Sequence, residues 1–484
     1  ETFVRDYGAC IVGGCCGTSP AHTRAVVKRL SGAPPVERTS EFELGASSLF
    51  TTVPYEQDAS FLIVGERANA NGSRKFKRLL GEENWDEMAN LVRDQAKEGA
   101  HIVDICVDYV GRDGVPDMER LVSESRGRTT LPFMLDSTEA PVLEAGLKLL
   151  GAKPIINSVH LEDGGERLDR VLRAATRYGA AVVALVIDEE GQARTADRKL
   201  AIAQRIYQIS TEEHGLWPGD LFFDALTLPL GSGQEELRND GKETLEAIRR
   251  IKAELPGVRT ILGVSNISFG LNPASRQVLN SIFVEEAVEA GLDAAIVNAR
   301  QILPAHRIPA QQRDVAHRLI QNEWLDDTDP LQAFMAVFED ASEQREAVDL
   351  TLKTVEERLH HRILEGLRDG IADDLDEAME EHDALRVVNQ LLLPAMQVVG
   401  DLFGAGKMQL PFVLQSAETM KSAVAYLEPH MERSDERGRG TIVLATVRGD
   451  VHDIGKNLVD IILSNNGFNT VNLGIKQPIA SVIE

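Results

Sequence analysis

The chain has 484 residues, a formal net charge of −25 at pH 7, and 43% hydrophobic and 26% charged residues. This composition is that of a globular protein and excludes a disordered tail, and the length predicts about three domains. The acidic balance, without a separate cluster of Lys and Arg, argues against nucleic-acid or membrane-surface binding. No apolar run approaches the ~20 residues of a membrane span, and no signal segment begins the chain, so we expect a cytoplasmic protein.

The two ends and the cysteines carry further information. The chain does not begin with Met, and residues 478–484 have the pattern of a helix that is just starting, so we expect a segment cut at both ends. Three of the four cysteines, Cys10, Cys15 and Cys16, lie within one short stretch. Four cysteines are too few for a disulfide framework, and their crowding indicates metal or redox chemistry.

Residues 61–321 alternate apolar, strand-like runs with helical patterns eight times. The predicted strands are residues 61–66, 101–107, 132–137, 154–159, 180–188, 221–227, 260–265 and 292–298. Parallel strands need crossover helices, and eight of them close around a core of side chains, so this pattern predicts a (β/α)₈ TIM barrel. A doubly wound open sheet is the alternative.

Many of these strands end in a polar residue. The set is Glu66-Arg67, Asp104 to Asp108, Asp136, Asn157, Asp188, Asp224, Asn266 and Asn298. In a barrel all carboxyl ends of the strands meet at one mouth, where active sites lie, so these side chains would converge there. A single Asp or Asn at such a position could equally cap the next helix, but the repetition favours a site.

After the polar stretch at residues 323–330 the pattern becomes helical up to about residue 431. Apolar residues recur at spacings of three and four from Leu352 to Ile371, and again over residues 383–399 and 411–427. This predicts a helix bundle. A charged linker at residues 433–440 then leads to a strand at 441–447, a helix at 455–465 and a strand at 469–473, which is the start of a Rossmann-like domain.

The sharpest motif follows the strand at 441–447 and opens the next helix. His452 lies two residues after Asp450, so one imidazole nitrogen can bind a metal while Asp450 hydrogen-bonds the other. A lone histidine on such a loop is more often a surface or capping residue. The full Asp-x-His-x-x-Gly string, however, resembles the corrinoid-binding signature of cobalamin-dependent methyltransferases, in which the histidine is the lower cobalt ligand.

That resemblance implies a set of cobalamin-binding residues. His452 would ligate cobalt, with Asp450 tuning its proton, and Phe403 and Leu410 in the preceding four-helix cap would cover the upper face; without the His motif these two would be ordinary bundle core. The implied cobalamin-binding set is Phe403, Leu410, Gly449, Asp450, Val451, His452, Asp453 and Gly455.

Motifs in the barrel resemble the pterin-binding barrel of the cobalamin-dependent methionine synthase family. They include Val64 to Asn69, Asn71 to Phe76 and Gly263 to Phe269. Acids and amides suit a pterin, whose edge alternates donors and acceptors. The resemblance implies that Asp136, Asn157 and Asp224 hold the pterin and that Asn266 lies near N5. It also implies folate contacts by Gly72, Ser73, Arg74 and Arg276. Some relatives have a second arginine where this chain has Gly270 to Pro273.

The amino-terminal stretch Ile11 to Thr18 resembles the end of the family's homocysteine-binding barrel, where adjacent cysteines bind a catalytic zinc. The resemblance makes Cys15 and Cys16 two thiolate ligands, with the third ligand upstream of Glu1. Zn²⁺ prefers soft thiolates, and adjacent cysteines rarely form a disulfide. We expect Cys10 to be a core residue and Cys106 to lie in a strand.

The resemblance implies a fragment of a cobalamin-dependent methionine synthase. Its domains would be the end of the homocysteine barrel (1–38), a linker (39–58), the folate barrel (59–325), the cap (331–436) and the start of the cobalamin domain (437–484). It would move methyl from 5-methyltetrahydrofolate to cob(I)alamin and then to homocysteine, with methylcobalamin and zinc as cofactors. A reductive reactivation system or domain would be a partner. The alternatives are a folate-dependent methyltransferase acting on a separate corrinoid protein, and a non-catalytic corrinoid carrier.

Overall fold

The structure is a computed structural model that forms two units, residues 1–44 and 45–484. The residues that it describes are 2–32, 43–57, 61–325, 327–339, 354–405, 408, 410–430, 440–447, 456, 459–460, 463, 468–477 and 482.

The first unit contains helices α1 (Thr2–Arg5) and α2 (Pro20–Leu30), and neither helix has a buried residue. Cys10 is exposed, so the expectation that it is a core residue is wrong. Among the described residues of this unit, the helices bury no side chain, and Cys10 therefore has no apolar core to enter.

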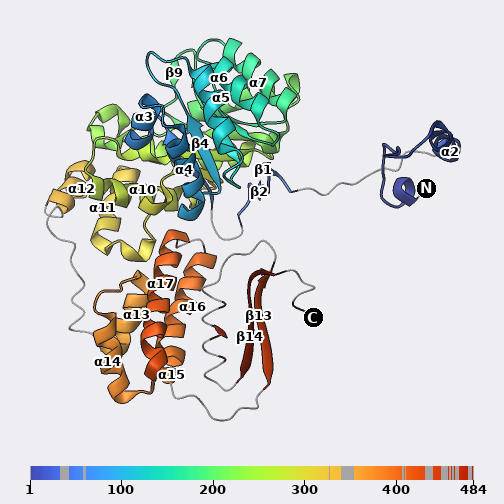
Figure 1. Cartoon of the computed structure of the whole chain (residues 1–484). Coiled ribbons are helices and arrows are strands. Elements are labelled where there is room, and N and C mark those ends of the chain that lie inside the picture. The colour runs from blue at the N-terminus through green and yellow to red at the C-terminus, as the bar shows by residue number, and fades with distance from the viewer. Residues whose placement is uncertain are drawn as a thin grey trace. The chain divides into compact units, whose positions relative to one another are not determined.

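The second unit begins with the barrel, whose eight parallel strands close on themselves (Figure 1). In barrel order they are β3 (Leu62–Asn69), β4 (Ile102–Cys106), β5 (Phe133–Asp136), β6 (Ile155–Val159), β7 (Ala181–Leu185), β10 (Leu221–Asp224), β11 (Arg259–Gly263) and β12 (Ala294–Val297). Because β12 pairs with β3, no strand edge is left open, and the predicted closed barrel is confirmed over the open sheet.

The barrel's main helices alternate with these strands. They are α3 (Arg74–Gly81), α4 (Trp85–Asp94), α5 (Gly114–Ser125), α6 (Ala140–Leu149), α7 (Glu166–Tyr178), α8 (Ala196–Gln208), α9 (Asp240–Glu254), α10 (Pro273–Glu289) and α11 (Ala310–Gln321).

One predicted strand, residues 180–188, is divided in the structure. Ile187 and Asp188 form β8 (Ile187–Asp188), which pairs antiparallel with β9 (Gly191–Gln192) outside the barrel. The chain reverses here with Gly191 in the left-handed region at φ +97. Asp188 consequently belongs to a hairpin and not to a barrel strand.

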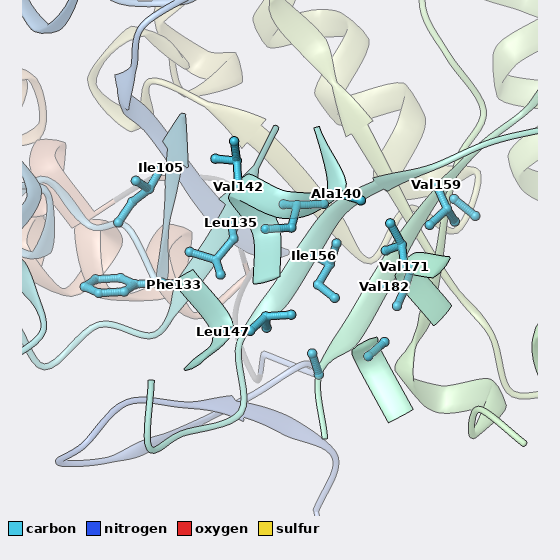
Figure 2. Packing of buried hydrophobic residues seen from close by; sticks show 14 of the residues in the cluster. Ile105, Phe133, Leu135, Ala140, Val142, Leu147, Ile156, Val159, Val171 and Val182 are labelled. Atoms are coloured by element: carbon cyan, nitrogen blue, oxygen red, sulfur yellow. The ribbon is translucent and has the colours of Figure 1, made fainter. Parts of the chain in front are cut away.

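Alternation along the strands decides which side chains face the barrel interior. Ile105, Leu135, Ile156 and Val182 pack with Val142 and Leu147 of α6 in the outer hydrophobic cluster (Figure 2). Successive residues of a strand point to opposite faces, so the neighbours of these residues point inward. Asp104, Asp136 and Asn157 are such neighbours, and they therefore face the inside of the barrel at its carboxyl end.

A short hairpin precedes the barrel within the expected linker of residues 39–58. Strands β1 (Gly45–Ser47) and β2 (Thr52–Pro54) pair antiparallel, and Ser47 exchanges hydrogen bonds with Lys153. Tyr55, 1% exposed, packs edge-on against Phe222 of β10 at 4.9 Å between ring centroids. This part of the expected linker is thus packed against the barrel.

The next helix, α12 (Pro330–Glu339), falls in the expected cap but packs with the barrel. Phe334 and Phe338, one turn apart, are buried in the cluster that contains α9, α10 and α11 side chains. The polar stretch before it is also attached, because Arg238 donates to Asp329 at 2.8 Å.

The remaining helices form the predicted bundle. They are α13 (Val355–Glu365), α14 (Ile371–Glu381), α15 (Ala384–Arg386) continuing through a π-helical turn, η11 (Val387–Leu392), into α16 (Leu393–Gly404), and α17 (Leu410–Leu427). The apolar stripe predicted from Leu352 to Ile371 is interrupted where Gly366 and Gly370 have positive φ, and Leu367 between them is 42% exposed. That stripe therefore belongs to two helices and the turn that joins them.

Residues 384–404 form one helix that is long and apolar enough to cross a membrane by length and composition, with a mean hydropathy of 1.2. A core helix of a bundle passes the same test. Val387, Val388, Leu392 and Ala395 of this helix are buried in the bundle core.

The end of the chain contains β13 (Thr441–Val447) and β14 (Asn469–Gln477), which pair in parallel. Both predicted strands are confirmed, and the second is four residues longer than expected. Most of the predicted helix between them lies outside the described residues.

Candidate functional site

The carboxyl ends of the barrel strands bring a group of buried carboxylates and amides together at one mouth. Asp104 of β4 and Asp136 of β5 both hydrogen-bond the same amide, because Nδ2 of Asn69 donates to Oδ2 of each at 2.7 Å. Three neighbouring strands supply these residues. Two carboxylates that share one amide donor cannot both be ionised without strong repulsion.

Burial gives these two acids unusual proton affinities. The pKa of Asp104 is raised well above its usual range, first by burial and then by the charge of Asp136. Burial also raises the pKa of Asp136 to about 6, against the lowering effect of the hydrogen bond from Asn69. The two acids therefore titrate as a coupled pair, and burial together with their mutual repulsion favours the neutral form of Asp104.

Asp224, at the end of β10, is a second acid of the same kind. It is 7% exposed, and burial raises its pKa to about 6, while a hydrogen bond from the backbone of Leu226 at 2.8 Å favours the ionised form. Behind it lies Lys199 of α8, whose side chain is 0% exposed and whose charge lowers the pKa of Asp224. Leu226, two residues after Asp224, has a backbone φ of +59°, in the left-handed region.

Lys199 holds this turn in place. Its Nζ donates to Oγ1 of Thr244 at 2.6 Å and to the carbonyl of Leu226 at 3.2 Å, and it pairs with Asp240 at 3.6 Å. The hydroxyl of Thr244 donates to the same carbonyl at 2.8 Å. Two donors on one carbonyl fix a left-handed residue that would otherwise be strained.

Glu66 faces the mouth from β3. Burial raises its pKa, and a hydrogen bond from Ser265 at 3.2 Å and the charge of Arg276 act in the opposite direction. Arg276 of α10 donates from Nε to Oγ of Ser268 at 3.2 Å. The predicted folate residue Arg276 thus lies beside the turn η6 (Val264–Ser268), which carries Asn266.

Asn266 is exposed on that turn, where a small ligand can reach its amide. Asn157 lies opposite Asp136 in the pairing of β5 with β6, so these two predicted pterin residues are direct neighbours. Asp136 is the last residue of β5, and Asn157 is the third residue of β6.

The predicted folate loop is attached to the carboxylate pair by Asn69. Oδ1 of Asn69 accepts from the backbone N–H of Asn71 at 2.8 Å and of Gly72 at 3.2 Å. Ser73 caps α3 by accepting from the N–H of Phe76 at 3.2 Å, and Arg74 is exposed at the first position of that helix. One side chain therefore links the loop to both acids.

Two residues of this site were not among the predicted folate-binding residues. Asp104 was predicted only as one of many strand-end polar residues, and Asn69 only as part of a motif. The signal for Asp104 was present, since it is an acid in the middle of an otherwise apolar strand, Ile102 to Cys106. The role of Asn69 depends on contacts 35 and 67 residues away, which no local pattern contains.

The predicted cobalamin residues are only partly visible. Gly449, Asp450, Val451, His452, Asp453 and Gly455 lie outside the described residues, as does the side chain of Leu410. Phe403 is 37% exposed at the end of α16 and is therefore not the ordinary core residue of the alternative interpretation.

The predicted zinc ligands Cys15 and Cys16 are exposed, with their sulfur atoms 3.8 Å apart. Hydrogen bonding from Cys16 lowers the pKa of Cys15, which favours the thiolate that a zinc ion requires. The donor set therefore fits two of the ligands of a thiolate-bound zinc.

Comparison with known proteins gives two domain matches. Residues 65–298 match the family described as pterin binding enzyme, and residues 355–428 match the B12 binding domain. The first match contains the barrel acids Glu66, Asp104, Asp136 and Asp224, and the second covers α13 to α17.

Two curated relatives resemble the whole chain. A methionine synthase of Mycobacterium tuberculosis is 54% identical over 490 residues, which cover 100% of this chain and 41% of that protein. A methionine synthase of Mycobacterium leprae is 50% identical over 500 residues, with the same two shares. The chain thus spans about two fifths of the length of these relatives.

Proposed function

We propose that the chain belongs to the methionine synthase family and carries out the folate half-reaction of a cobalamin-dependent enzyme of that kind. In this half-reaction a methyl group passes from 5-methyltetrahydrofolate to cob(I)alamin, and the other half-reaction passes it on to homocysteine. The observation that carries the proposal is the set of buried acids and amides at the barrel mouth, within the segment that matches a pterin binding enzyme.

The chemistry of this mouth suits a reduced pterin. The pterin ring edge presents N–H donors beside N and O acceptors, and each needs a partner when the ring is desolvated. Asp136 and Asp224, both with a pKa of about 6, are carboxylates at neutral pH and can accept from the ring donors. Asn157 offers both an acceptor and a donor beside Asp136.

Transfer of the methyl group requires protonation at N5, because an uncharged pterin nitrogen is a poor leaving group. We place the amide of Asn266 near N5, where its oxygen accepts from the N5–H and so stabilises the protonated form. Ring binding by the acids and N5 stabilisation by the amide are separate tasks. Bound cobalamin supplies the nucleophilic cobalt that takes up the methyl group.

The other parts of the reaction extend this proposal. His452, with Asp450, would hold cobalt from below, and Phe403 and Leu410 would shield its upper face. Cys15 and Cys16 would bind the zinc that lowers the pKa of the homocysteine thiol. We also propose a cytoplasmic location and a reductive reactivation partner, because a highly reduced cofactor is prone to oxidation.

The first prediction tests the folate half-reaction directly. Under anaerobic conditions, with excess cob(I)alamin and 5-methyltetrahydrofolate, the chain should cause loss of the cob(I)alamin absorbance. Asn266→Ala should slow this loss by about 100-fold, the usual effect of removing one amide that stabilises developing charge. Asn90→Ala, on the outer helix α4, is the matched control and should react as the wild type does.

Two outcomes would contradict the proposal. If Asn266→Ala reacts at the wild-type rate, the amide has no part in the chemistry. If the chain binds the folate but leaves the cob(I)alamin signal unchanged, its site does not present methyl to free corrinoid, and a separate corrinoid protein or a carrier function becomes the better explanation.

A further inference from the structure

Arg167, in the first turn of α7, contacts the two strand ends that carry Asp136 and Asn157. Its Nη1 donates to the carbonyl of Ser158 at 2.6 Å, and its Nη2 donates to the carbonyl of Ser137 at 2.7 Å. Its Nε donates to the carbonyl of Thr138 at 2.9 Å. One planar guanidinium thus holds the residue after each of the two predicted pterin ligands.

Asp108 also holds the same loop. The Oδ1 of Asp108 accepts from Oγ of Ser137 at 2.7 Å, and its Oδ2 accepts from the N–H and the hydroxyl of Thr138 at 2.8 and 3.0 Å. Arg167 donates hydrogen bonds to the carbonyl groups of the loop, and Asp108 accepts hydrogen bonds from its N–H and hydroxyl groups. The loop after β5 therefore has its polar groups satisfied by two fixed, oppositely charged side chains.

Arg167 is itself fixed. Its backbone N–H donates to Oδ2 of Asp163 at 3.0 Å, which anchors the first turn of α7. The neighbouring exposed arginine Arg173, by contrast, pairs only with Asp169 on its own helix, and its side chain is 73% exposed. The two arginines lie on the same helix and have very different environments.

We propose that Arg167 is a positioning residue of the pterin site, which holds Asp136 and Asn157 in register by binding the backbone that follows each of them. A lysine could supply the charge but not three directed hydrogen bonds from one planar group. The inference rests on the proposed function, because it concerns the geometry of the same pterin site.

The charge of Arg167 adds a second effect. It lowers the pKa of Asp136, while Asp108 raises it. The charged and titratable groups around these two residues are Asp104, Cys106, Asp108, His160 and Asp163. Removing the guanidinium should therefore raise the pKa of Asp136, and binding that needs the carboxylate should then fail at a higher pH than in the wild type.

The test compares Arg167→Met, Arg167→Lys and the control Arg173→Met. Affinity for 5-methyltetrahydrofolate is measured by isothermal titration from pH 5 to 8.5, and the melting temperature of each variant is recorded alongside. Arg167→Met should weaken binding about 10- to 100-fold above pH 8 and raise the pH midpoint of binding. Arg167→Lys should weaken binding but keep the midpoint, and Arg173→Met should match the wild type.

The outcomes separate this inference from the function. If the wild type binds the folate and both Arg167 variants bind equally well with the same pH midpoint, the positioning role is overturned and the function stands. A lower melting temperature with unchanged affinity in the folded protein also overturns it, because that result describes a purely structural arginine. If the wild type itself does not bind, the proposed function falls together with this inference.

Discussion

Two sides of the barrel mouth each keep a buried carboxylate ionised, and they do so in different ways. Asp136 and Asp224 both face the interior, and burial raises the pKa of each to about 6. Asp136 has a second acid, Asp104, beside it, and both accept from the amide of Asn69. Asp224 instead has the buried cation Lys199 behind it.

The difference shows two ways to keep one carboxylate charged in a dry site. On the first side burial and the repulsion between the two carboxylates favour the neutral form of the more deeply buried Asp104, which lets its neighbour ionise. On the second side a fixed positive charge lowers the pKa of the acid directly. The first arrangement depends on proton sharing and the second on an ion pair, so they should respond differently to substitution.

The largest expected effect is on the lysine side. Lys199→Met removes the partner of Asp240, whose side chain is 2% exposed, and leaves that charge buried. The free energy of unfolding should fall by about 3–5 kcal/mol, measured by urea denaturation at pH 7. The pterin affinity should also decrease, because the carbonyl of Leu226 loses one of its two donors.

A double variant and a surface control sharpen this test. Lys199→Met with Asp240→Leu should recover much of the lost stability, because both charges are then gone. Arg250→Met breaks an ion pair with Asp197, which is 90% exposed, and should leave the free energy of unfolding almost unchanged. A Lys199→Met protein as stable as the wild type would mean that the pair contributes nothing.

The next effect is a pH dependence of intermediate size. The pKa of Asp224 is about 6 in the folded state and near 3.8 unfolded, so its destabilising contribution is absent below pH 3.8 and complete above pH 6. Lowering the pH from 7 to 5 should therefore return about 1 kcal/mol of stability from this group. Asp136, with the same shift, should contribute about as much.

Other groups oppose this trend, so the measurement is a difference between proteins. Burial lowers the pKa of His101 to about 4, which destabilises the fold as the pH falls below 6.5. The stability of Asp224→Asn relative to the wild type, measured at pH 5 and 7, cancels that contribution. The free energy of unfolding of Asp224→Asn should increase relative to that of the wild type as the pH rises. If the difference between the two proteins is the same at pH 5 and 7, Asp224 has an ordinary pKa.

The sequence predicts the barrel and its mouth because both follow from local periodicity. Eight alternating patterns give the strands, and the inward face of a strand follows from a period of two, so Asp136, Asn157 and Asp224 are placed by counting along their strands. The sequence instead assigns the helix α12 to the cap, because the polar stretch before it resembles a linker. Phe334 and Phe338 of this helix contact the barrel core only in the folded state, which no local pattern shows.

The supporting contacts are not predictable in this way. Asn69 contacts a residue 67 positions away, Arg167 one that is 30 positions away and Lys199 one that is 45 positions away. Each is a polar residue in a helix or strand whose own pattern suggests a solvent-facing role. Nothing in the spacing of Lys199 on α8 indicates that it is fully buried. The ligand-facing residues are set by strand register, whereas the residues that tune them are set by packing.

The smallest expected effect distinguishes the two members of the acid pair. Asp104→Asn replaces an acid whose neutral form is favoured by burial with a neutral amide of the same shape, so its carbonyl can still accept from Asn69. At pH 7 the free energy of unfolding should change by less than about 1 kcal/mol, since no charge is removed. Asp136→Asn removes a carboxylate that accepts from the pterin and should weaken folate binding at least about 10-fold. Isothermal titration of both variants at pH 7 should show the larger loss of folate affinity in Asp136→Asn. Equal losses of affinity in the two variants would mean that Asp104 is ionised and that the proton is not held there.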